Sequence, residues 1–170
     1  MGVNRYKEHM VVLLEDKPYR EIINGIQILS NIKSNVFDIK NPCGGWDKVF
    51  ESLKNNIHLL EKYEACNILL LMDFDDKTSD GSDFFNQKME KFHNLVPTQY
   101  ANRVFLLGVN HKESESLKKF FNKSNFEDIG KLLIEDCPAD NSKWDNIHLQ
   151  CNSAEINRMQ RLGVYKWLFQ

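Results

Sequence analysis

Three short runs of apolar residues constrain the fold of this chain more than any other feature. They occupy residues 10–14 (MVVLL), 68–72 (ILLLM) and 104–109 (VFLLGV), and polar residues flank each of them. Unbroken apolar runs of this length are typical of strands that are buried on both faces of a parallel sheet. A weaker run over residues 36–39 indicates one more strand. The sequence therefore predicts a sheet in the interior of the molecule.

The segments between these runs have the spacing of amphipathic helices. Pro18 stands where the first turn of a helix tolerates proline, and helical spacing of apolar residues continues to Leu29. Apolar residues between Val49 and Leu60 mark a second helix, and residues 84–92 begin a third. Strands that alternate with helices predict an α/β fold, with a mostly parallel four-stranded sheet between two helical layers.

Further helices are expected after the last run. Leu117 lies on one of them, and Ser124 with Glu127 and Asn152 with Glu155 have the spacing of capping boxes that open two more. We predict a single domain over residues 1–170. Its core spans about residues 10–122, and a helical extension follows over about residues 123–170.

Charge and cysteine content exclude several classes of protein. The 170 residues include 22 Lys and Arg against 24 Asp and Glu, a net charge of −2, which excludes a strongly basic nucleic-acid coat protein and an acidic tail protein. No apolar run approaches the roughly 20 residues that span a bilayer, so no membrane partner is expected. The four cysteines form no CxxC pair and indicate reduced thiols in a cytoplasmic protein. They are Cys43, Cys66, Cys137 and Cys151.

Acidic residues follow the first two strong runs directly. Glu15 and Asp16 come after the first, and Asp73, Asp75 and Asp76 come after the second. In parallel sheets, ligands bind at the carboxyl ends of the strands. If these two strands are neighbours, the carboxylates converge there and repel one another unless a cation or a proton intervenes. Such oxygen donors suit Mg²⁺ or Mn²⁺, so the sequence predicts a site for one of these ions.

The same segments resemble a known family. VVLLE at residues 11–15 and LLLMDFD at residues 69–75 are similar to the motifs of the TOPRIM domain, which topoisomerases, bacterial primases and several nucleases share. The resemblance implies a TOPRIM-like fold in which Glu15 is the general acid or base and Asp73 and Asp75 bind Mg²⁺. Asp16 stands where family members usually have glycine, a residue that lets the backbone approach a phosphate closely. The chain shows no topoisomerase tyrosine domain and no zinc ribbon, so the resemblance is closest to a small stand-alone protein of the nuclease branch.

Other residues are candidates for the same site. Asp76 and Glu115 are candidates for additional metal ligands. Four residues near the expected strand ends are candidates for phosphate contacts, and each of them has an alternative interpretation as part of a solvated helix face or an exposed loop. They are Lys17, Arg20, His111 and Lys112.

Two functions follow from this pattern. The first is Mg²⁺-dependent action on phosphodiester bonds of DNA or RNA, with salt-sensitive substrate binding because the chain is slightly acidic. The alternative is a non-catalytic TOPRIM-like or receiver-like module that binds a protein partner. The receiver-like version requires Asp16, Asp73 and Lys112 around one pocket. DFDDKT at residues 73–78 also resembles a haloacid-dehalogenase motif, but that family has its motif on the first strand of its core.

Overall fold

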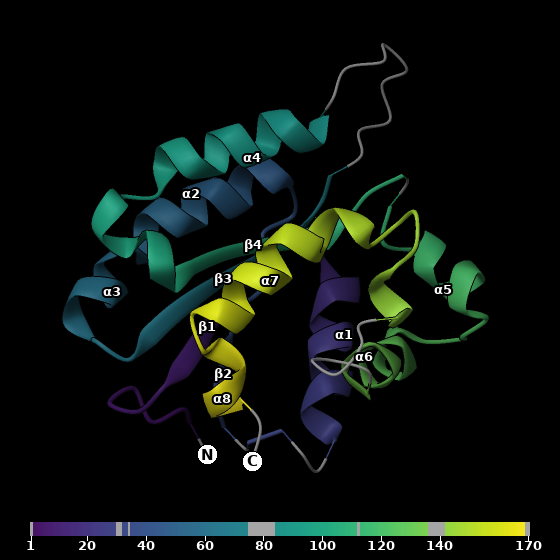
Figure 1. Cartoon of the computed structure of the whole chain (residues 1–170), viewed down its shortest axis with the longest axis horizontal. Coiled ribbons are helices and arrows are strands. Elements are labelled where there is room, and N and C mark those ends of the chain that lie inside the picture. Colours follow the sequence, from purple (N-terminus) through teal and green to yellow (C-terminus); the bar gives the residue numbers. More distant parts are fainter. Residues whose placement is uncertain are drawn as a thin grey trace.

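The computed structural model is an α/β fold with a four-stranded, all-parallel sheet between two layers of helices (Figure 1). It describes residues 2–29, 32–33, 35–74, 84–111, 113–135 and 142–168. The strand order is β2-β1-β3-β4. The strands are β1 (His9–Leu14), β2 (Phe37–Ile39), β3 (Cys66–Asp73) and β4 (Val104–Val109). The predicted fold class is therefore confirmed.

The two strongest apolar runs form the two central strands. β1 pairs with β3 in parallel, from His9 opposite Cys66 to Leu14 opposite Leu71. All residues of β1 are buried, as are those of β3 up to Met72. The unbroken runs thus reflect burial on both faces, because helices cover each side of the sheet.

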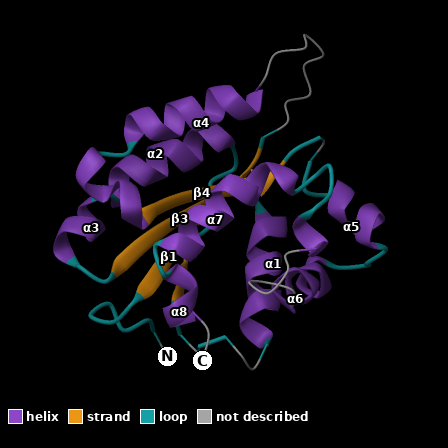
Figure 2. Ribbon diagram, in the orientation of Figure 1, coloured by secondary structure: helices purple, strands orange, loops and turns teal. Residues whose placement is uncertain are grey.

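The two faces carry different sets of helices (Figure 2). One face, here called the α2 face, packs against the residues of three helices that lie between β2 and β4 in the sequence. These helices are α2 (Trp46–Asn56), α3 (His58–Lys62) and α4 (Phe84–Leu95). The other face, here called the α1 face, packs against the first helix and the C-terminal ones. These helices are α1 (Lys17–Ile28), α5 (Ser116–Phe121), α6 (Phe126–Glu135), α7 (Ser153–Arg161) and α8 (Val164–Leu168).

Helices α1 and α6 touch backbone to backbone at two glycines. A Cβ atom added at Gly25 would lie 2.0 Å from the carbonyl oxygen of Glu127, and one added at Gly130 would lie 2.0 Å from that of Ile22. Any side chain at either position would force the helices apart. This contact fixes α1, and with it the residues that follow β1, against the C-terminal half of the chain.

The outer edge of β4, which pairs with no further strand of the described residues, is covered by side chains of α7 and of the turn before it. Glu155 Oε2 accepts a hydrogen bond of 3.1 Å from the backbone N–H of Leu106. Asn152 bonds both backbone groups of Gly108, at 2.9 Å through Oδ1 and 2.8 Å through Nδ2. These side chains replace the hydrogen bonds that a fifth strand would make, and so protect an edge that could otherwise pair with another chain.

This arrangement corrects the predicted capping boxes. Asn152 is the residue before α7, but it makes no capping bond because its side chain is engaged with Gly108. The Ser124 prediction was also wrong in detail, since Asn125 Oδ1 accepts the N–H of Asp128 at 2.8 Å at the start of α6. The predicted helices exist, but the expected capping residues do not open them.

Two predicted helices are each divided in two. The stretch from Val49 to Leu60 breaks at Ile57 into α2 and α3, and the C-terminal stretch breaks at Gly163, whose φ is +76°, into α7 and α8. Short 3-10 helices complete the described elements. They are η1 (Thr98–Arg103), η2 (Ser142–Trp144) and η3 (Gln150–Asn152).

Within the described residues, no helix is both long enough and apolar enough to cross a membrane. Cys43, Cys66 and Cys151 are free thiols. Cys66 is the first residue of β3 and is buried. Cys137 lies outside the described residues.

Candidate active site

The carboxylates that follow β1 and β3 meet at the carboxyl edge of the sheet. The N–H of Glu15 donates to the carbonyl oxygen of Leu71 at 3.0 Å, which continues the β1–β3 ladder. The N–H of Asp73 donates to Glu15 Oε2 at 2.9 Å. The expectation that these two strands are neighbours and bring their acids together is confirmed.

Asp73 is held by residues from three other segments. The hydroxyl of Tyr19 on α1 donates to Asp73 Oδ1 at 2.6 Å, and the N–H of Ser114 donates to the same oxygen at 3.1 Å. The ammonium group of Lys88 on α4 donates to the carbonyl oxygen of Asp73 at 2.9 Å. Lys88 is only 4% exposed, so this positive charge lies inside the site.

A glycine-containing turn after β2 packs against Glu15. The N–H of Gly44, whose φ is +82°, donates to the carbonyl oxygen of Glu15 at 2.7 Å. The N–H of Trp46, at the start of α2, bonds the Glu15 carboxylate and lowers its pKa. The glycine that the TOPRIM resemblance expects directly after Glu15 is absent. Backbone N–H groups reach Glu15 instead from the segment between β2 and α2.

The environment raises the pKa of both acids. Burial is the largest cause of the raised pKa of Glu15, and the charge of Asp73 adds to it. Burial likewise raises the pKa of Asp73, against the opposing effect of the bonds from Tyr19 and Ser114. Burial at this site therefore disfavours the ionised form of both carboxyls, an effect also used in the acid–base centres of enzymes.

Asp16 is the most strongly perturbed carboxyl of this group. Burial, and then the charges of Asp73 and Glu15, raise its pKa to about 7. Its Oδ1 atom is buried and has no hydrogen-bond partner within the described residues. The hydroxyl oxygen of Ser114 is also buried without a hydrogen-bond partner within the described residues. Ser114 is 1% exposed, and its backbone N–H donates to Asp73. Buried polar atoms without partners are uncommon, and at a functional site they point to a missing ion, water or ligand.

The donor chemistry of this edge fits a hard divalent cation. Glu15, Asp16 and Asp73 offer carboxylate oxygens, which Mg²⁺ and Mn²⁺ prefer. Among the described residues, no group of three or more His, Cys, Asp or Glu side chains is arranged to hold a metal ion. Asp75 and Asp76 lie outside the described residues, so their part in the predicted site stays a prediction.

The remaining candidate residues are placed as follows. Lys17 is exposed and forms an ion pair of 3.4 Å with Glu21 on the same helix. Glu115 is exposed and pairs with Lys118 at 3.2 Å, but its charge still contributes to the raised pKa of Asp16. Arg20 is partly buried on α1. His111 is exposed with a φ of 51°, and Lys112 lies outside the described residues.

Sequence reasoning missed three residues of this edge, namely Tyr19, Lys88 and Ser114. Tyr19 lies one helical turn after Asp16, so an aromatic residue closely following the acids was an available signal. Lys88 comes from α4, whose placement over the site depends on tertiary packing. Ser114 contributes its backbone N–H, for which residue type carries no signal.

Comparison with known proteins adds no assignment to this geometry. No protein-family model, no curated protein and no solved structure matches the chain.

Proposed function

We propose that this protein is a Mg²⁺-dependent, TOPRIM-like enzyme that cleaves phosphodiester bonds in nucleic acid. The observation that carries the proposal is the convergence of Glu15 and Asp73, joined by a 2.9 Å hydrogen bond, with Asp16 beside them. Three carboxyls with raised pKa values at one edge favour either protonation or a bound cation.

Glu15 is the proposed general acid or base. Its raised pKa brings it closer to neutral pH, where a carboxyl can accept a proton from an attacking water and return it to a leaving oxygen. The N–H groups of Asp73 and Trp46 fix the orientation of its carboxylate. Asp73 and Asp16, with Asp75 as predicted from the motif, would hold the metal.

The bound metal would stabilise the negative charge on the scissile phosphate. Lys88 supplies a buried positive charge beside Asp73, which lowers the pKa of both Asp73 and Glu15 and limits their mutual repulsion. Tyr19 and the N–H of Ser114 hold Asp73 Oδ1 in place.

A calorimetric titration with Mg²⁺ and Mn²⁺ tests the metal site. Wild-type protein should bind with micromolar to millimolar affinity, and the variant Asp73→Ala/Asp75→Ala should not bind. Glu61→Gln is the matched control, because Glu61 is an exposed acid on α3, before the start of β3. Absence of binding to the wild type would contradict the proposal.

A cleavage assay on DNA and RNA at low salt, with Mg²⁺, Mn²⁺ or chelator, tests the chemistry. Glu15→Gln should retain metal binding and lose cleavage at least 100-fold, since loss of a general acid or base costs about 10²–10⁴-fold. Equal cleavage by wild type and Glu15→Gln would indicate a contaminating nuclease and would remove the assigned role of Glu15.

One observation favours the alternative of a non-catalytic interaction module. Internal partners already engage the acids, since Asp73 Oδ1 accepts two hydrogen bonds and Glu15 Oε2 accepts one. In that case the carboxylates serve the fold, and the wild type would bind neither metal nor nucleic acid. Incubation with acetyl phosphate separates the receiver-like version, in which the mass of the protein would rise by one phosphoryl group on Asp73.

A further inference from the structure

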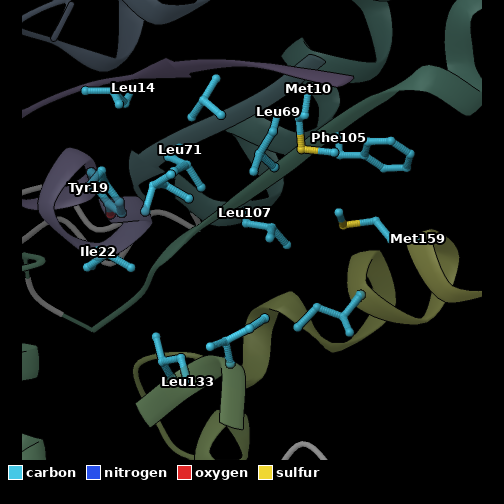
Figure 3. Close-up of a cluster of buried hydrophobic side chains, with 14 of the residues drawn as sticks. Met10, Leu14, Tyr19, Ile22, Leu69, Leu71, Phe105, Leu107, Leu133 and Met159 are labelled. Atoms are coloured by element: carbon cyan, nitrogen blue, oxygen red, sulfur yellow. The ribbon is translucent and has the colours of Figure 1, made fainter. Parts of the chain in front are cut away.

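A cavity that is partly open to solvent lies between the α1 face of the sheet and the C-terminal helices. Its volume is about 90 Å³, and side chains of the sheet, α1, α6, α7 and α8 line it. Figure 3 shows Leu71 and Leu107 from the sheet, Ile22 from α1, Leu133 from α6 and Met159 from α7 around this part of the core.

The two faces of the sheet differ in how closely they are packed. Leu70 and Met72, on the α2 face, are 0% exposed. Leu71 of the same strand and Leu107 of the adjacent β4 are 6% and 8% exposed on the α1 face, and both line the cavity. The space is therefore a local property of the α1 face.

The wall of the cavity offers water little to bind. Tyr19, Trp144 and Asn152 line it, but the Tyr19 hydroxyl is bonded to Asp73, the Trp144 N–H to the carbonyl of Leu133, and the Asn152 amide to Gly108. An ordered water needs two to four polar partners, so this apolar wall holds ordered water poorly. An apolar cavity of about 150 Å³ is known to bind benzene or xenon, and the thioethers of Met10 and Met159 allow this wall to adapt.

We propose that this cavity is a binding site for a small apolar molecule, no larger than a single ring or a short alkyl chain, and that Tyr19 couples its occupancy to Asp73. Tyr19 forms part of the cavity wall, and its hydroxyl donates to Asp73 Oδ1 at 2.6 Å. A ligand that displaces the Tyr19 ring changes this hydrogen bond. The proposal does not depend on the function proposed above, because it requires only that Asp73 carries a carboxyl group.

Binding is tested with benzene and xenon on the whole chain. Saturating benzene should raise the melting temperature of the wild type, and amide NMR shifts should concentrate on lining residues. Leu107→Phe, which fills the space, should bind benzene at least tenfold more weakly, whereas Leu107→Met, of similar volume, should bind as the wild type does. If Leu107→Phe fails to fold, Leu133→Phe fills the space from α6.

The coupling is tested by the carboxyl ¹³C resonance of Asp73. Benzene should shift this resonance in the wild type, while Tyr19→Phe should bind benzene with little change at Asp73. Absence of benzene and xenon binding to the wild type, or equal binding by Leu107→Phe, would overturn the site. Binding without any change at Asp73 in the wild type would overturn the coupling.

Discussion

Two acidic sites in this molecule, one buried and one half-buried, have their negative charge compensated to different degrees. Glu155 on α7 is 7% exposed, and the guanidinium of Arg158 lies 2.5 Å from it while also bonding the carbonyl oxygens of Ala101 and Val104. Glu15, Asp16 and Asp73 instead lie beside one another. The charge of Asp73 raises the pKa of both Glu15 and Asp16, and the charge of Glu15 raises that of Asp16.

The difference separates an acid whose charge is matched within the chain from acids whose charges are only partly matched. At β4, charge and hydrogen bonds are matched within the chain, so the Glu155–Arg158 pair completes an edge of the sheet. At the carboxyl edge, Lys88 acts on Asp73 and Glu15, and Asp16 Oδ1 has no partner among the described residues. Uncompensated charge away from solvent is costly, and this is the reason why the cation proposed above would bind here.

The largest effect is expected when the balanced site is broken. Arg158→Met should destabilise the protein by about 3 kcal/mol, because it leaves Glu155 buried without its countercharge. Urea denaturation measures the change. The double variant Glu155→Gln/Arg158→Met should recover most of the loss, since the glutamine oxygen can still accept the N–H of Leu106. A loss below about 1 kcal/mol in the single variant would mean that solvent already compensates Glu155.

An intermediate effect is expected at the contact between the unbalanced site and the core. Tyr19→Phe removes the hydroxyl that bonds Asp73, and a hydrogen bond to a charged group is worth about 1.5–3 kcal/mol. We expect a loss near the lower bound and a further rise in the pKa of Asp73, because the hydroxyl lowers it. Urea denaturation and carboxyl ¹³C titration measure the two quantities. An unchanged Asp73 titration would show that the hydroxyl does not stabilise the ionised form.

The difference between these two sites also explains how far the sequence was informative. Glu15 and Asp73 could be paired in advance, because two apolar runs predicted buried parallel strands whose carboxyl ends share an edge. The role of Glu155 could not. Its spacing from Asn152 matches a capping box, but its partner is the N–H of Leu106, 49 positions earlier in the chain. A local pattern carries no information about such a distant backbone group.

The same reasoning applies to the cations of the two sites. Arg158 is one helical turn from Glu155, and this spacing is equally typical of an ion pair on the exposed face of a helix. Lys88 reaches Asp73 only because α4 packs over the α2 face near Trp46, whose ring lies 5.1 Å from the Lys88 ammonium. Both cations depend on tertiary packing, which residue type and spacing alone do not specify.

The smallest effect is expected when one negative charge is removed from the unbalanced site at Glu15, Asp16 and Asp73. The pKa of Asp16 is raised to about 7 in the folded protein, whereas an unfolded Asp titrates near 4. Between these values the folded state holds the proton and the unfolded state has lost it, so stability falls as pH rises from about 4 to 7 and is level above that. Asp16→Asn removes this dependence.

The gain should be about 1 kcal/mol at pH 8 and absent at pH 4, because solvent screens a carboxyl that is only half-buried and reduces the effect of the full shift. Thermal denaturation at the two pH values measures it, with Asp128→Asn as control, since Asp128 pairs with Lys131 on α6 and its pKa is lowered. Added Mg²⁺ should stabilise the wild type at pH 8 more than Asp16→Asn, because the ion and the substitution relieve the same repulsion. Equal stabilisation of both proteins by Mg²⁺ would place the cation away from Asp16.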